Sequence, residues 1–198
     1  MRNIAVVFIV LFFTACSTTY PSIIEYKIDT EVQIPQNLED SCQKSSLTVA
    51  QVFVKSSLMS KKMKYVVGKY KEFAYNQSEW AENPNRAISD VIVKALESAN
   101  IFQTAGSYKS FSRSDYTLES RVDLFSQYFS EDKKESFVKI AIVFSLIDNK
   151  TAKIIASKHI SKERKIQKAN AQSGVIALNE LLGESLDEMI QWISGSCE

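Results

Sequence analysis

The chain of 198 residues has few of the residues on which most active sites depend. It contains one histidine, His159, and five glycines, whose spacing forms no phosphate-binding loop. Acidic residues are spread along the chain without suggesting a general acid and base pair, and no histidine pair or cysteine cluster has metal-ligand spacing. His159 lies in a strand-like segment and is expected to be a surface or hydrogen-bonded residue. We therefore expect a protein that is not an enzyme and has no catalytic residue, metal or cofactor.

Net charge is also nearly absent. The chain has 24 basic and 23 acidic residues, and residues 1–15 contain only Arg2, so the remainder is balanced. A balanced surface gives no reason to expect a nucleic acid partner. Hydrophobic residues make up 45% of the chain, as in an ordinary globular domain.

The N-terminus carries the clearest signal. Arg2 precedes an apolar run over residues 4–13, and Ala15 and Cys16 follow. A basic start, an apolar run of roughly ten residues and a small residue before the cut predict a signal peptide over residues 1–15. The segment resembles the lipobox of bacterial lipoproteins, with Phe13 where an aliphatic residue is usual. This resemblance implies that Cys16 carries acyl chains; the alternative is an ordinary signal peptide followed by an incidental cysteine.

Two further features concern the compartment. In the sorting rule of enteric lipoproteins, Asp after the lipidated cysteine retains the protein at the inner membrane, so Ser17 favours the periplasmic face of the outer membrane, with the inner membrane as the alternative. Cys42 and Cys197 then remain in an oxidising space and form a possible disulfide. Such a bridge would contribute about 4 to 5 kcal/mol in the chain-entropy model. The alternative is two unpaired thiols.

Apolar periodicity predicts an α+β fold with a mostly antiparallel sheet and two amphipathic helices, at about 84–99 and 170–193, on one face. The expected strands lie within residues 23–29, 47–54, 63–67, 69–75, 101–104, 115–129, 137–147 and 152–162. Asn83 and Asn170 are expected to cap the two helices with their side chains, and Pro84 to occupy the first helical position.

Three segments follow from this pattern. Residues 1–15 are the signal peptide, residues 16–46 the lipidated N-terminus, tether and first strand, and residues 47–198 a single α+β domain. Within the second segment, residues 36–46 are polar and predict an exposed connection. The aromatic residues of 65–75 are expected to serve sheet packing, with a ligand surface as the alternative.

The segment EWAENP, residues 79–84, followed by a helix that ends in LESANIF, resembles the family of ABC-type transport auxiliary lipoproteins. These accompany MCE-domain lipid-transport systems, including paraquat-inducible and Mla-like ones. Trp80 and Pro84 match the family pattern as structural residues, whereas Asn83 stands where the family often has another proline. The resemblance covers nearly the whole mature chain but does not extend to Cys42 and Cys197.

The resemblance implies a non-enzymatic subunit that anchors or docks a periplasm-spanning assembly at the outer membrane. Its partner would be an MCE-domain protein, and a homo-oligomeric ring is one arrangement of the family. The alternative function is that of an assembly lipoprotein, a chaperone or pilotin for an outer-membrane barrel or secretin. A third is direct lipid carriage, which requires an apolar cavity between sheet and helices. Free edge strands are the expected docking surface.

Overall fold

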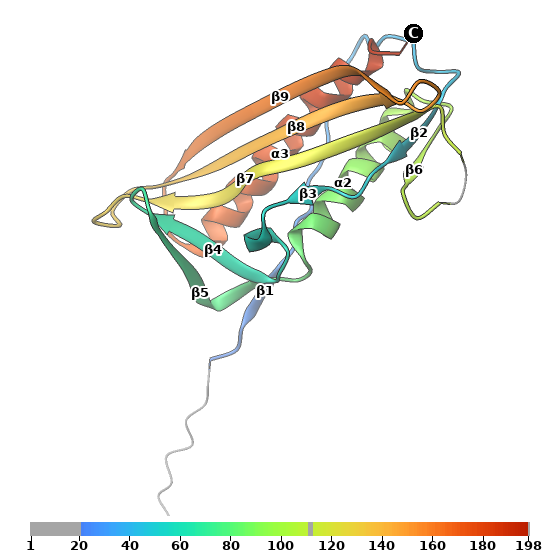
Figure 1. Ribbon diagram of the computed structural model, residues 1–198. Helices are drawn as coiled ribbons and strands as arrows, with labels where there is room; N and C mark the ends of the chain where they lie inside the picture. The colour runs from blue at the N-terminus through green and yellow to red at the C-terminus, as the bar shows by residue number, and fades with distance from the viewer. Residues whose placement is uncertain (1–20, 111–112, 198) are drawn as a thin grey trace, which may run out of the picture.

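The computed structural model describes residues 21–110 and 113–197 (Figure 1). The predicted signal peptide, residues 1–15, and Cys16 lie outside the described residues. The strands are β1 (Ile24–Tyr26), β2 (Ser46–Val49), β3 (Phe53–Val54), β4 (Lys62–Val67), β5 (Lys71–Trp80), β6 (Thr104–Ser107), β7 (Tyr116–Phe129), β8 (Ser136–Asp148) and β9 (Lys153–Ile166). The helices are the short 3₁₀ turn η2 (Ser56–Leu58), α2 (Pro84–Ala99) and α3 (Ala171–Ser194).

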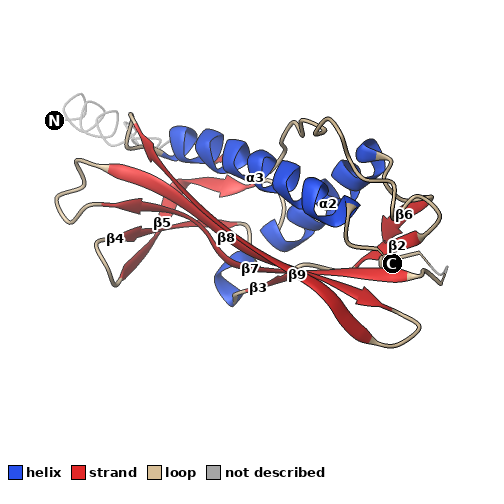
Figure 2. Cartoon of the chain, turned by 90° about the horizontal axis from the view of Figure 1, so that it is seen from above, coloured by secondary structure: helices blue, strands red, loops and turns tan. Residues whose placement is uncertain are grey.

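The α+β class is confirmed. The described strands form one nine-stranded sheet, and α2 and α3 lie on the same face of it (Figure 2). β7, β8 and β9 are the long antiparallel strands. The other side of β7 is covered by β2, β3 and β4 in succession, β6 is added next to β2, and β5 and β1 are added next to β4.

The expected mostly antiparallel sheet is wrong, because the sheet is mixed. Five described strand pairs are parallel, β1–β5, β2–β6, β2–β7, β3–β7 and β4–β7, and three are antiparallel, β4–β5, β7–β8 and β8–β9. The antiparallel pairs are neighbours in sequence that tight turns join. The parallel pairs join strands that are distant or separated by a crossover, and apolar alternation gives no information on such pairing.

Several strand limits also differ from expectation. Residues 47–54 form two short strands, and Phe53 is 60% exposed, so this segment is not one buried strand. The strand expected at 101–104 begins only at Thr104 and continues to Ser107. β9 continues to Ile166 because its charged end still pairs with β8, where Lys139 and Glu163 form an ion pair at 2.8 Å.

Both expected helices are confirmed. Pro84 occupies the first turn of α2, and Asn170 caps α3, where its Oδ1 accepts a hydrogen bond from the Ser173 amide at 2.9 Å. The expected side-chain cap at Asn83 is wrong. Asn83 is the N-cap residue of α2, but its backbone carbonyl, not its side chain, accepts the hydrogen bonds from the Arg86 and Ala87 amides.

The core lies between the sheet and the two helices. The alternate residues of β8 that face the helices are all fully buried, and they are Val138, Ile140, Ile142, Phe144 and Leu146. In β7 a bulge between Val122 and Leu124 reverses the alternation, so that Phe125, Gln127 and Phe129 face the core instead of Leu124 and Tyr128. The amide of buried Gln127 is fully used: it accepts from Tyr75 and donates to Ser136 and to the Asn170 carbonyl.

Candidate functional site

A strap, defined as residues 27–42, follows α3 from its first half to its C-terminal end (Figure 1). It is held by side chains of α3 that bind the strap backbone. The Asp29 amide donates to Asn179 Oδ1 at 3.2 Å, while Asn179 Nδ2 donates to the Lys27 carbonyl at 3.1 Å. One side-chain amide thereby takes the place of a neighbouring strand, because it satisfies both a donor and an acceptor of the extended backbone.

Gly183 lies one helical turn after Asn179 and allows the strap to come close. A Cβ at this position would lie 2.5 Å from Thr30 Oγ1 and 2.9 Å from the Glu31 carbonyl oxygen. Residues four apart lie on the same helix face, so the stripe continues to Asp187. Glycine within the helix is thus explained by the passage of the strap.

Asp187 provides the next contact. Its Oδ1 accepts a hydrogen bond from the Gln33 amide at 2.9 Å. Desolvation raises the pKa of this carboxyl, and Glu184 adds to the rise, although the Gln33 bond and Lys162 act in the opposite direction. The strap therefore covers a carboxylate that water would otherwise solvate.

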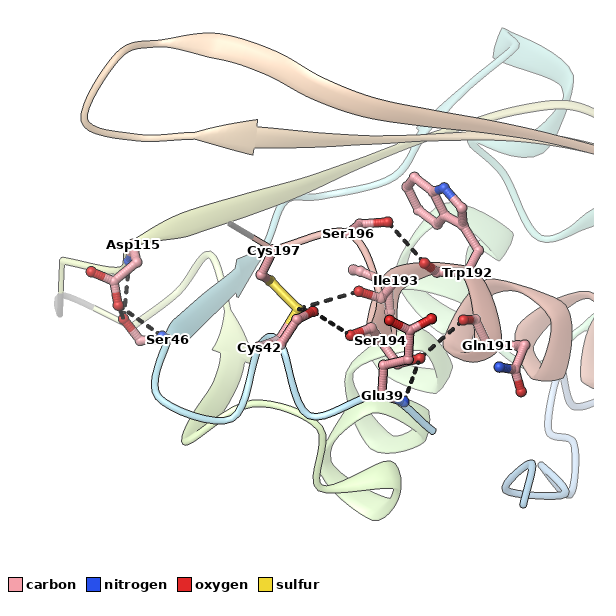
Figure 3. Close-up of a disulfide and its surroundings, with 11 residues drawn as sticks. Glu39, Cys42, Ser46, Asp115, Gln191, Trp192, Ile193, Ser194, Ser196 and Cys197 are labelled. Atoms are coloured by element: carbon pink, nitrogen blue, oxygen red, sulfur yellow. Dashed lines mark hydrogen bonds between the residues drawn. A yellow bond between two sulfur atoms is a disulfide. The ribbon is translucent and has the colours of Figure 1, made fainter. Parts of the chain in front are cut away.

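The strap ends at the disulfide between Cys42 and Cys197 (Figure 3). Ser41 Oγ donates to the Ser194 carbonyl at 2.6 Å, and the Glu39 amide donates to Ser194 Oγ at 3.3 Å. Cys42 is fully buried, so the expectation of an exposed connection over residues 36–46 is wrong at this point. Its Sγ lies 3.2 Å from the Ile193 carbonyl; since a bonded sulfur carries no proton, this is a contact and not a hydrogen bond.

β9 is an edge strand, and its only partner among the described strands is β8. Three of its basic side chains pair with acidic residues of α3, which fastens the strand to the helix. These pairs are Lys158–Glu188, Lys162–Glu188, Arg164–Glu180 and Arg164–Glu184. His159 is exposed and lies opposite Val143 in the register. The backbone of the outer edge remains available for a partner strand.

Trp80 and Pro84 have packing roles. Trp80 ends β5 and is 4% exposed, and its ring lies 5.8 Å from that of Phe125, centroid to centroid. Pro84 is buried at the start of α2. Neither residue lies beside a cluster of reactive groups.

The described residues bring together no group of His, Cys, Asp and Glu that could hold a metal ion. The space between the sheet and α3, beside Trp80, Phe125 and Leu178, is a cavity of about 10 Å³. An acyl chain cannot enter a space of this size. A larger groove of about 630 Å³ between the strap and α2 is open, and its lining includes Lys27, Asp29, Glu82, Asp90, Lys94 and Glu97.

The family model described as ABC-type transport auxiliary lipoprotein component matches residues 26–190. The chain belongs to this family. The match confirms the family that was expected from Trp80, Pro84 and the helix that follows them. A lipoprotein auxiliary component of a transporter associates with a membrane and with a transporter, and the family is not a known enzyme family. No helix among the described residues has the length and apolarity needed to cross a membrane.

Two solved structures resemble this family member. A protein from Xanthomonas campestris has 17% identity and a TM-score of 0.77, with 87% of this chain and 96% of that chain covered. An uncharacterized protein has 18% identity and a TM-score of 0.63, with 83% and 99% covered. At such identities the likeness concerns the fold alone. No curated protein sequence matches the chain significantly.

The strap is the feature that sequence reasoning missed. Its signal was the four-residue spacing of Asn179, Gly183 and Asp187 within an otherwise apolar helix. Polar and small residues four positions apart lie on one helix face, and such a face suits contact with the backbone of another segment better than contact with a lipid or an apolar core.

Proposed function

We propose that this family member is the non-enzymatic lipoprotein subunit of an ABC-type lipid-transport system that contains an MCE-domain protein. In this proposal Cys16 is acylated after removal of residues 1–15 and anchors the protein at the periplasmic face of the outer membrane. The observation that carries the proposal is the family match over residues 26–190. The ATPase and permease are then other chains.

The interior of the fold supports an adaptor and not a carrier. The space beside Trp80 and Phe125 measures about 10 Å³, whereas a lipid chain requires a cavity of hundreds of Å³ on the scale of roughly 300–1,000 Å³ typical of ligand sites. Lipid would therefore pass along a partner that this protein holds in place.

The free edge of β9 is the docking surface in this proposal. A strand of 14 residues with one described partner offers backbone donors and acceptors to an MCE-domain protein or to a second copy in a ring. Its fastening to α3 through Arg164 and the two lysines keeps the edge in a fixed position, which favours binding because less order must be gained on docking.

The test is a crosslinking pull-down from membranes with wild type, Cys16→Ala and Ser17→Ala. Acylation contributes about 0.8 kcal/mol per buried methylene, so loss of Cys16 removes the anchor. We expect wild type and Ser17→Ala to recover an MCE-domain protein and Cys16→Ala to recover much less. Ser17→Ala is the matched control because it changes the neighbouring residue and leaves the thiol.

Two outcomes of this experiment would contradict the proposal. Recovery of an outer-membrane barrel or secretin without an MCE-domain protein would replace transport by assembly as the function. Unchanged membrane association of Cys16→Ala would contradict the anchor.

A further inference from the structure

The direction of β1 shows from which side the chain enters the described fold. β1 runs parallel to β5, with Ile24 beside Ser78 and Tyr26 beside Trp80. Since β5 starts at the β4–β5 turn and runs away from it, the chain that precedes Ile24 comes from the side of that turn. In Figure 1 the described chain enters from below the sheet, beside the end of β5, while the β4–β5 and β7–β8 turns lie at the left end of the molecule.

The two turns form one surface, the hairpin end, defined as residues 68–73 and 130–135. The Gly68 amide donates to the Phe129 carbonyl at 2.9 Å, and Lys71 pairs with Glu131 at 2.8 Å. Gly68 has a φ of 60°, a left-handed conformation that favours glycine in this tight turn.

Aromatic rings and lysines collect at this end, on both faces of the sheet. Five of the six lysine–aromatic contacts within residues 21–110 and 113–197 lie in the hairpin end or in the strand residues next to it: Lys69–Tyr70, Lys133–Tyr65, Lys133–Phe73, Lys139–Tyr128 and Lys139–Phe137. Tyr70 is 83% exposed at the turn, and Phe73 is 44% exposed. Both rings therefore present apolar surface to the solvent.

We propose that the hairpin end rests in the headgroup region of the bilayer that carries the acyl anchor. Tyrosine and lysine side chains suit this region because an apolar body enters the lipid while the polar end stays in water. The inference rests on the proposed anchor at Cys16. Residues 16–23 reach at most about 26–29 Å when extended. Ile24 pairs with Ser78, eight residues after Tyr70, so at most about 26 Å of strand separates it from the hairpin end, and the register shift in β5 shortens this distance. The turn residues and the acylated cysteine thus reach the same membrane surface.

The lysines indicate the charge of that surface. The four carboxylates of the hairpin end, Glu72, Glu131, Asp132 and Glu135, are each paired with a lysine. Lys69 and Lys133 are in none of the described ion pairs and lie over aromatic rings. Two ammonium groups are therefore available for lipid phosphates, and each contributes about 1 kcal/mol at an anionic surface. A second weak membrane contact beside the acyl chains would hold the molecule upright, with the disulfide end pointing away from the bilayer.

The test places a fluorescent label at Tyr70→Cys in the full acylated chain. With Cys16 acylated and Cys42 bridged to Cys197, the introduced thiol is the one that reacts. The matched control is Tyr108→Cys, since Tyr108 is 42% exposed and carries Lys109 at 5.8 Å, but follows β6 beside β2 at the opposite end. Both proteins are reconstituted into vesicles of phosphatidylethanolamine and phosphatidylglycerol that contain a nitroxide-headgroup lipid.

We expect about twofold quenching of the label at position 70 and little at position 108, because a headgroup quencher acts only within the interface. Lys133→Glu should reduce the quenching at position 70, and Lys109→Glu should leave it unchanged.

Equal accessibility of both labels on vesicle-bound protein would overturn the inference while the anchor stands. A label at 70 that is shielded from a water-soluble quencher but not quenched by the lipid would assign the surface to a protein partner. Protein that is not acylated and stays off the vesicles would overturn both the anchor and the inference.

Discussion

At the residue scale, Gly183 decides how closely the strap can follow α3. Gly183→Ala improves helix propensity by about 1 kcal/mol but places a methyl group against the Glu31 carbonyl oxygen, 2.9 Å away. We expect little change in the free energy of unfolding. The strap amides of Asp29 and Gln33 should exchange with deuterium roughly tenfold faster, because each hydrogen bond contributes about 0.5–1.5 kcal/mol.

Gln191→Ala is the control for this prediction, since Gln191 is exposed on the same helix. It should change helix propensity slightly and leave strap exchange as in wild type. Unaltered exchange at Asp29 and Gln33 in Gly183→Ala would show that the strap does not depend on the missing side chain.

Asp187 makes the strap sensitive to pH. Its pKa is raised by desolvation, so the folded state favours the protonated carboxyl, and stability is lost as pH rises through the folded pKa. Asp187→Asn keeps an oxygen for the Gln33 amide and removes the buried charge. We expect a gain in stability below about 1 kcal/mol at neutral pH that vanishes below the ordinary Asp pKa of about 3.9.

Urea unfolding between acidic and neutral pH measures this difference. Asp187→Ala is the matched variant, because it removes the acceptor as well as the charge and should cost about 1 kcal/mol at neutral pH. A gain from Asp187→Asn that is the same at all pH values would disprove the titration of this carboxyl as its cause.

At the element scale, the strap and its disulfide join the N-terminal part of the described chain to the end of α3. The disulfide closes a sequence separation of 155 residues, for which the chain-entropy model gives up to about 5 kcal/mol. Cys42→Ser combined with Cys197→Ser should lower the free energy of unfolding by up to this amount. A hydroxyl facing the Ile193 carbonyl, now 3.2 Å from sulfur, would offset a small part.

Chemical denaturation with and without a phosphine reductant measures this loss. Reductant should bring the wild type to the stability of the double variant and should leave the double variant unchanged. Two thiols of the periplasmic protein that alkylate freely without reductant would contradict the bridge.

The helices were predictable from the sequence, whereas the β7 bulge and the parallel strand pairs were not. Both helices were predictable because Pro84 and Asn170 mark their starts and the apolar stripes repeat every three or four residues. The bulge in β7 was not, since alternation continues through Val122 and gives no sign of the inserted residue. Likewise the parallel pairing of β2, β3 and β4 with β7 depends on long-range contacts that no local pattern encodes.

At the scale of the whole molecule, sequence motifs identified the family while the structure assigned the motif residues. Trp80 and Pro84 pointed to the family although both serve packing. The surfaces that can act outward, the β9 edge and the hairpin end, have no motif, because exposed backbone and scattered tyrosines look ordinary in sequence. These surfaces form only when the sheet brings distant segments together, with the β9 edge along one side and the turns at one end (Figure 2).

The β9 edge leads to the last prediction, which concerns assembly. If a partner adds a strand there, a photo-reactive residue at exposed Ser157 should crosslink to that partner in membranes. Arg121, exposed in β7 within the middle of the sheet, is the matched position and should yield little product, because β8 separates it from the edge. Crosslinks between copies of the chain would make the edge a ring contact, and crosslinks to an MCE-domain protein would make it the docking site. Equal yields at both positions would place the partner on the open sheet face and exclude strand addition, since only the edge strand has unpaired backbone groups to offer.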